Sequence, residues 1–274
     1  APPVAQRGWA LFGLEEWGLG LARFQAGGRV EQTRYNPEGL RRRSFTGASG
    51  AVGAIVPLWR GGALAANYTH SFRPPALEEL YNFGPHTGNL TFEVGSATLN
   101  PERANGLDVA LRQRSQRIHG EVNFFYYRLD RFIYLAPTGQ IRRGLIEARY
   151  DQAGSRYMGA EARVDVHLRT GLILDGAVDT VDAQLRDSRR PLPRIPPARG
   201  HLGLDWSFKN FRLKPELVLV NAQAQIFSTE TRTAGYALVN LGAAYNWAAQ
   251  HAFHVISLNV TNTADRLCRN HLSF

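Results

Sequence analysis

The residues best suited to chemistry lie in the stretch FRPPALEELYNFGPHTGNLTFEVG at 72–95. His86 is in a Gly-Pro-His-Thr-Gly turn, and Glu78, Glu79 and Glu93 are near it in the sequence. Imidazole and carboxylate groups are common zinc ligands, so His86 is a candidate metal ligand or ligand contact. The alternative is a surface histidine in a turn. We favour that alternative, because one histidine and scattered carboxylates form no recognised ligand spacing.

Two runs of arginine could recruit an anion. A planar guanidinium binds carboxylates and phosphates through two parallel hydrogen bonds, so each run suits an anionic metal chelate. Contact with anionic lipid headgroups, or a solvated basic rim, explains the same residues and is the interpretation we favour. The runs are Arg41, Arg42 and Arg43 in one expected loop, and Arg189, Arg190 and Arg194 in another.

Charged residues also alternate along RYMGAEARVDVHL at 156–168. Glu161, Arg163, Asp165 and His167 share one side of an extended chain, where opposite charges most often form a structural ladder. The sequence has no Gly-x-Ser-x-Gly elbow and no phosphate-binding loop. We therefore expect no enzyme and no bound cofactor.

Composition narrows the class of protein further. The chain has 274 residues, with 32 Lys and Arg against 23 Asp and Glu, and a net charge of +9. We find no helix-turn-helix, zinc-finger spacing or aromatic RNA-binding signature, so the basic excess does not indicate nucleic acid. The single Cys268 excludes an internal disulfide framework. We expect one domain over residues 1–274.

The elements that must position these residues are strands, because the hydrophobic pattern has a period of two. Along 156–168 one face is apolar and the other is charged, and 107–114 and 253–261 alternate in the same way. Many of the segments are longer than the usual strand of about 5–6 residues. About twelve strands are predicted, at 9–17, 19–34, 44–56, 61–72, 102–115, 118–135, 144–168, 171–184, 199–208, 211–226, 235–247 and 252–263.

Short and long connections take turns along the chain. The long ones are expected at 35–43, 73–101, 136–143, 185–198 and 227–234. This parity is typical of an antiparallel up-and-down transmembrane β-barrel, with short turns on one side and long loops on the other. The longest apolar stretch, 51–59, is too short for a membrane helix, but a barrel is the other structure that can span a bilayer.

In such a barrel the apolar faces contact lipid and the charged faces line the lumen. The lumen-facing residues are predicted to be Asp108, Arg112, Glu161, Arg163, Asp165 and His167. The tryptophans Trp9, Trp17, Trp59, Trp206 and Trp247 lie near predicted strand ends, where either an interfacial belt or a sheet rim would place them.

The alternative is a soluble β-rich binding or adhesion module. Tyr68, Phe124 and Tyr126 distinguish the two readings, because they face lipid in a barrel and pack a core in a soluble module.

Two segments resemble TonB-dependent outer-membrane receptors. In 71–112 the first part has Phe-Arg-x-Pro followed by Leu-x-Glu-Leu-Tyr, and the last part has Leu-x-Pro-Glu before the next strand. Where the family usually has Gly-Asn-Pro, this chain has Gly95-Ser96-Ala97. The closing run LVNLGAAYNW…HVISLNVTNTADRLCRNHLSF is similar to the family's penultimate strands. The matching residues of the first segment are Phe72, Arg73, Pro75, Leu77, Glu79, Leu80, Tyr81, Leu99, Pro101 and Glu102.

The resemblance implies a receptor in a Gram-negative outer membrane that takes up a ferric siderophore, a metal ion or cobalamin. Its partners would be membrane lipid and lipopolysaccharide, the nutrient, and the TonB complex acting through a plug domain. Some zinc-uptake receptors are similar around Gly-Pro-His, so a zinc receptor is an alternative. The outer-loop residues then expected to bind ligand are Arg41, Arg42, Arg43, Arg73, Glu78, Glu79, Tyr81 and His86, with His86 as the metal ligand.

Family barrels have about 22 strands around a plug. We find no counterpart of the plug, the TonB box or the closing strand, and therefore expect a fragment of the barrel. Two open edges in lipid would each leave about five backbone groups unpaired, at several kcal/mol per group. The sum exceeds the usual stability of about 5–15 kcal/mol.

Overall fold

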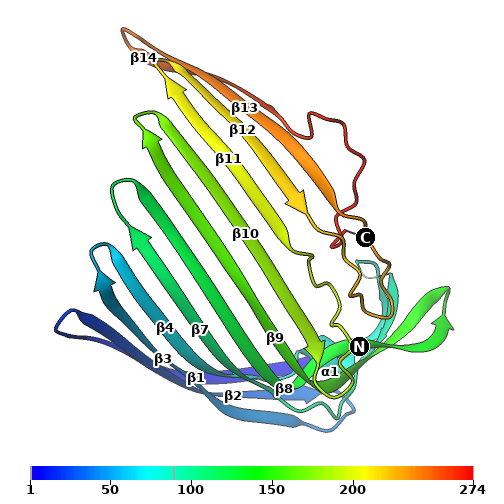
Figure 1. The fold of residues 1–274 in the computed structure, drawn as a ribbon. Coiled ribbons are helices and arrows are strands. Elements are labelled where there is room, and N and C mark those ends of the chain that lie inside the picture. Colours follow the sequence, from blue (N-terminus) through cyan, green and yellow to red (C-terminus); the bar gives the residue numbers. More distant parts are fainter. Residues whose placement is uncertain (1, 89, 274) are drawn as a thin grey trace.

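The computed structural model describes residues 2–88 and 90–273 and is a single curved β-sheet (Figure 1). Twelve long strands follow one another across the sheet in the order of the sequence, each antiparallel to the next. They are β1 (Val4–Leu19), β2 (Ala22–Pro37), β3 (Arg43–Trp59), β4 (Gly62–Arg73), β7 (Glu102–Arg114), β8 (Ile118–Arg142), β9 (Leu145–Arg169), β10 (Leu172–Leu185), β11 (Arg199–Phe208), β12 (Phe211–Val220), β13 (Tyr236–Ala249) and β14 (Ala252–Val260). The expected partial, up-and-down arrangement of about twelve barrel strands is confirmed.

The connection between β4 and β7 contains structure of its own. It contains a short helix, α1 (Leu77–Tyr81), and β5 (Phe83–His86) and β6 (Thr91–Val94) form a short hairpin after it. β6 also pairs with β9, and this pairing is parallel. The long stretch at 73–101 is therefore an ordered loop that folds back on the sheet.

Turns at one end of the sheet are short, and the long connections lie at the opposite end (Figure 1). One expected loop is wrong: residues 136–143 continue β8 to Arg142, and Arg143 and Gly144 alone make the turn into β9. Both have positive φ, 52° and 77°, as a two-residue hairpin turn with matching twist requires. Pro137 and Gly139 are of residue types that are common in turns, but here they lie in an irregularity of the β8–β9 register and not in a loop.

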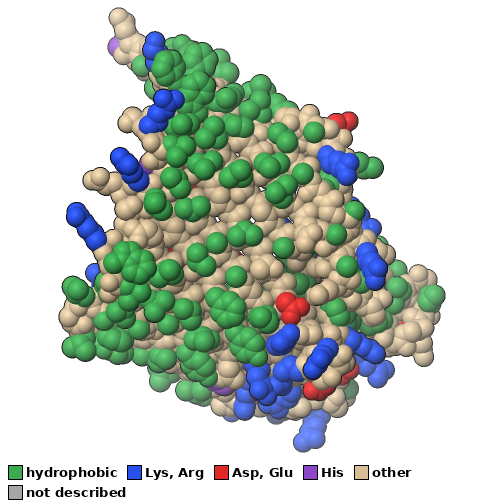
Figure 2. Space-filling model, viewed as in Figure 1, with side chains coloured by type: hydrophobic (Ala, Val, Ile, Leu, Met, Phe, Trp, Pro, Cys, Tyr) green, Lys and Arg blue, Asp and Glu red, His purple; other side chains and the backbone are tan. Residues whose placement is uncertain are grey.

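The sheet has one apolar and one polar face. Directly paired residues share a face, and Tyr68, Leu107, Tyr126 and Met158 form one such row across four strands. Tyr68, Phe124 and Tyr126 are 46%, 44% and 39% exposed. They pack no core, as expected for a barrel wall and not for a soluble module. Hydrophobic side chains cover much of the face seen in Figure 2, and Lys and Arg gather near the long-loop end.

Most buried hydrophobic residues are at the long-loop end. One cluster joins the long-loop ends of β2, β3 and β4 to the 74–101 loop, and a second joins β10 to the loop that follows it. Along the middle of the wall, by contrast, Ala110 is a rare buried apolar residue. The loops are thus held by their own hydrophobic core. The first cluster contains Tyr35, Phe45, Phe72, Leu80, Tyr81, Leu99 and Ile133, and the second contains Ala183, Leu185 and Leu192.

Aromatic residues gather at the short-turn end. Trp17 stacks on Phe24, and Trp206 stacks on Phe208, with ring centroids 5.9 and 6.2 Å apart. Trp59 and Trp247 are also within two residues of a short turn, whereas Trp9 is in the interior of β1, because that strand begins at Val4. The described residues contain no helix that is both long and apolar enough to cross a membrane.

Candidate functional site

Arg73 ties the long loop to the sheet. It ends β4, and its Nε donates to Glu102 Oε2 at 2.5 Å while Nη1 donates to both carboxylate oxygens of Glu79 at 3.0 Å. Glu79 in turn accepts from the backbone N–H of Ala76, just before α1, at 2.8 Å. Burial lowers the pKa of the Arg73 guanidinium, but the hydrogen bonds and charges of Glu102 and Glu79 outweigh it and raise that pKa. Arg73 and Glu79 therefore shape the loop.

The tip of the β8–β9 hairpin and the β5–β6 hairpin form a small outer sheet. Residues Thr91–Val94 of β6 pair in parallel with Ile146–Arg149 of β9. The Arg142 guanidinium lies over the rings of Phe83 and Phe92, 5.4 and 5.3 Å from their centroids. Arg142 also forms an ion pair with the buried Glu147. Stacking and ion pairing together fix the guanidinium, so the outer sheet is held by side chains as well as by backbone hydrogen bonds.

His86 lies at the surface of this outer sheet beside a buried carboxylate. Its Nδ1 is 3.8 Å from Glu93 Oε1, and its side chain is half exposed. Glu93 Oε2 accepts from the Tyr150 hydroxyl at 2.9 Å and from Asn82 Nδ2 at 3.1 Å. Burial, reinforced by the hydrogen bond to Glu93, raises the pKa of Tyr150, which keeps its hydroxyl a neutral donor. Within the described residues, no three His, Cys, Asp or Glu side chains come together as a metal site. His86 as a metal ligand stays a prediction.

The remaining loop residues predicted to bind ligand differ in position: some are buried or hold the loop, and others are exposed. Tyr81 is buried in the first hydrophobic cluster. Arg43 donates to the backbone oxygens of Ala97 and Leu99, the latter at 2.6 Å, so it braces the loop. Arg42 donates to Asn36 Oδ1 at 2.7 Å, and Arg41 and Glu78 are exposed.

The six polar residues predicted on the strands share one face of the sheet. Asp108 of β7 is paired with Phe125 of β8, which is paired in turn with Gly159 of β9. Arg112 is connected to Arg163 in the same way, through Glu121. The charged side chains of β7 and β9 therefore lie on the same side of the sheet. Glu161, Asp165 and His167 lie two or four residues from Arg163 and point the same way. We call this set, Asp108, Arg112, Glu161, Arg163, Asp165 and His167, the polar strip.

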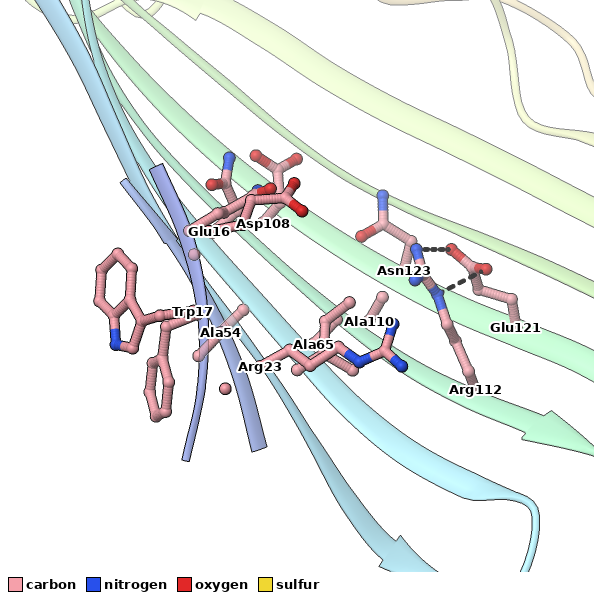
Figure 3. Close-up of a pocket in the computed structure, with 17 residues that line it drawn as sticks. Glu16, Trp17, Arg23, Ala54, Ala65, Asp108, Ala110, Arg112, Glu121 and Asn123 are labelled. Atoms are coloured by element: carbon pink, nitrogen blue, oxygen red, sulfur yellow. Dashed lines mark hydrogen bonds and ion pairs between the residues drawn. The ribbon is translucent and has the colours of Figure 1, made fainter. Parts of the chain in front are cut away.

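A surface cavity of about 680 Å³ opens beside the polar strip. Figure 3 shows Asp108, Arg112, Glu121 and Asn123 lining it, with Trp17 on the other side of β1 from Glu16. Arg112 donates to Glu121 at 3.0 Å, and Tyr127 donates to Asp108 at 2.6 Å. The cavity therefore presents side chains of both positive and negative charge, and Arg112, Glu121 and Asp108 already have hydrogen-bond partners within the protein.

The sequence matches the family model described as TonB dependent receptor-like, beta-barrel, over residues 2–262. The chain belongs to that family. Its fold is similar to that of the copper transporter OprC, with a TM-score of 0.86 at 20% identity, over 98% of this chain and 44% of that one.

Two further transporters have a similar fold. The iron transporter FrpB from Neisseria meningitidis gives a TM-score of 0.76 at 13% identity, over all of this chain and 44% of that one. The ferric citrate transporter FecA gives 0.75 at 17% identity, over 96% of this chain and 41% of that one. The chain spans less than half the length of these transporters.

Sequence reasoning missed several polar groups of this receptor barrel. Glu121 and Tyr127, the partners of Arg112 and Asp108, follow from the short turn at 115–117, which sets the β7–β8 register. His201 was also missed: its Nε2 is 2.8 Å from Glu216 Oε1 and its Nδ1 is 3.5 Å from Asp175 Oδ1. These three residues come from three strands, so no local sequence pattern brings them together.

Proposed function

We propose that this chain forms part of the wall and the outer loops of a TonB-dependent nutrient receptor in a Gram-negative outer membrane. The observation that carries the proposal is the sheet itself: one face is apolar and exposed, the other is polar, and the long, ordered connections lie at one end. A bilayer needs strands of about 9–11 residues, and the twelve long strands of this sheet have 9 to 25. The apolar face contacts lipid, and the polar strip faces the lumen.

The nutrient arrives at the long-loop end in this proposal. Arg41, Glu78 and His86 are the candidate ligand contacts, because their side chains lie at the surface. Arg43, Arg73, Glu79 and Tyr81 hold the loop that presents them. The proteins of similar fold reported above are transporters of copper, iron and ferric citrate. The cargo class we propose is a metal ion or a ferric siderophore, with cobalamin added because the family resemblance implies it, taken up with energy from the TonB complex through a plug.

The test is TonB-dependent accumulation in cells that express the full-length protein. Cell-associated copper, iron and zinc are measured by mass spectrometry, and labelled cobalamin is counted, in a strain with TonB and in its TonB deletion. We expect one of these nutrients to accumulate only when both the receptor and TonB are present. If none of them accumulates in a TonB-dependent way, the transport proposal is wrong.

The contact of His86 with Glu93 favours a zinc receptor as a second candidate. An imidazole 3.8 Å from a carboxylate offers two groups of the kind that bind zinc, at the end of the sheet where we place the ligand. His86→Ala in the full-length receptor is expected to lower zinc accumulation and leave its surface abundance unchanged. Equal zinc accumulation by the variant and the wild type would remove this candidate.

A further inference from the structure

Four arginines surround a second surface cavity, where β1, β2 and β3 reach the long-loop end of the sheet. The cavity has a volume of about 450 Å³, and its described lining contains no Asp or Glu. Arg7 comes from β1 and Arg34 from β2. Arg42 is in the turn before β3, and Arg43 is the first residue of β3. Asn36 and Ser44 add polar groups to the lining. The site therefore gathers positive charge and hydrogen-bond donors without a carboxylate to balance them.

The strand pairing makes this charge imbalance costly. Arg7 and Arg34 are directly opposite each other in the β1–β2 pair, where like charges destabilise a sheet. Elsewhere in the described chain arginines commonly pair with carboxylates, as Arg112 does with Glu121 and Arg199 with Asp179. In the same described residues, none of the four cavity arginines forms an ion pair with a carboxylate. An anion in the cavity would relieve the repulsion between Arg7 and Arg34.

The cavity lies on the apolar face, just beyond its hydrophobic band. Ser44 pairs with Arg34, so Arg7, Arg34 and Ser44 form one row across three strands. The next row toward the short-turn end contains Trp9, Gln32 and Thr46.

That neighbouring row fixes the depth of the arginines. Gln32 donates to Thr46 at 2.9 Å and accepts from the Trp9 indole at 3.4 Å, and Leu11 and Val30 continue the same face with exposed apolar side chains. Two residues of a strand rise about 7 Å, so the arginines are one step above an aromatic and polar row. This is the depth at which the phosphates of a membrane lipid lie when the apolar face is in the bilayer.

We propose that Arg7, Arg34 and Arg42 form a binding site for a phosphate group of an outer-leaflet lipid headgroup. The proposal rests on the membrane-spanning function proposed above. A guanidinium donates two parallel hydrogen bonds to phosphate oxygens, and forks on adjacent strands approach the phosphate from two sides. Arg42 is oriented by its hydrogen bond to Asn36. Arg43 is committed to the loop carbonyls of Ala97 and Leu99 and contributes charge only. The site faces the lipid and not the polar strip, so its ligand is a lipid and not the transported nutrient.

The experiment compares the thermal stability of the full-length protein in detergent with three additives: bis-phosphorylated lipid A, phosphatidylcholine, and inorganic phosphate. The test variant is Arg7→Gln/Arg34→Gln, and Arg42→Gln changes the loop side of the site without altering a strand. Arg60→Gln/Arg117→Gln is the matched control, because it removes two exposed arginines at the short-turn end. Resistance to dodecyl sulfate without heating reports folding of the barrel separately for every variant, and flotation with lipid vesicles reports insertion.

We expect lipid A to raise the unfolding temperature of the wild type and of the control equally. In the test variant the shift should fall to less than about half, because two charge-assisted contacts are lost, and Arg42→Gln should lower it by a smaller amount. Phosphatidylcholine and inorganic phosphate should have no effect. An equal lipid A shift in the test variant, or an equal shift with inorganic phosphate alone, would overturn the lipid site. A wild-type protein that does not insert would instead refute the membrane-spanning function on which the site depends.

Discussion

At the scale of single residues, Arg73 is the contact that holds the loop at 74–101 in place. Arg73→Ala would leave Glu102, which is 7% exposed, as a nearly buried carboxylate without its cation. Breaking a fully buried pair costs about 3–5 kcal/mol, but Arg73 is 44% exposed, so a loss of about 2 kcal/mol is expected. Hydrogen exchange over 74–101 should become faster, while Arg60→Ala, at an exposed turn, should leave it unchanged. Equal exchange in the two variants would show that the loop does not depend on Arg73.

The partly buried Tyr150 hydroxyl makes the same loop sensitive to alkali. Its pKa in the folded protein is raised above the value of about 10 expected in an unfolded chain. The folded state therefore holds this proton more tightly, so the stability it contributes is complete below pH 10 and is lost as the pH rises through the folded pKa. Limited proteolysis of the 83–94 hairpin should accelerate above pH 10. Tyr150→Phe should make that acceleration smaller, and an unchanged pH profile would contradict the assignment.

At the scale of elements, the strands were predictable and their contacts at the loop end were not. A period of two and alternating turn lengths are local properties, so twelve strands and their order follow from the sequence. The extension of β8 past Pro137 does not, because it pairs with the start of β9, which β6 in turn joins by parallel pairing from about 50 residues earlier in the chain. The same reason separates the candidate residues: Asp108 and Arg112 share a face by alternation alone, whereas the burial of Tyr81 depends on Leu99 and Ile133.

Strand β7 packs against β8 through a glycine that leaves space for a ring. A Cβ at Gly106 would lie 2.2 Å from the Tyr127 ring, and Tyr127 donates to Asp108. Gly106→Ala should therefore push the ring aside and cost about 1–3 kcal/mol, as overpacking usually does. Gly28 of β2 is the matched control, since a Cβ there meets nothing within 4 Å. Denaturant titrations of the two variants, followed by tyrosine and tryptophan fluorescence, should differ by that amount, and equal midpoints would exclude a role for the ring contact.

At the scale of the whole molecule, the sheet places little of its buried hydrophobic surface along the wall. Both described clusters are at the long-loop end, and Leu, Val and aromatic side chains on the apolar face stay exposed. Burial of apolar area is the main driving force of folding, so a wall of this kind needs another apolar phase to cover that face. A contiguous apolar surface of this extent on a protein in water would be a site of association. The proposed bilayer supplies the missing cover.

Two adjacent residues of β8 test which phase covers each face. Val122 is on the apolar face and 53% exposed, and Asn123 is on the polar face opposite Glu161. In lipid vesicles, Val122→Arg should cost more than about 1 kcal/mol, because the charge must leave water and enter the apolar phase. Asn123→Arg should cost less than about 1 kcal/mol, since the lumen is hydrated and Glu161 offers a counter-charge. Unfolding titrations of the full-length protein in vesicles measure both values. If the two variants were equally stable, the apolar face would be in contact with water, and a soluble binding module would be the better description of the chain.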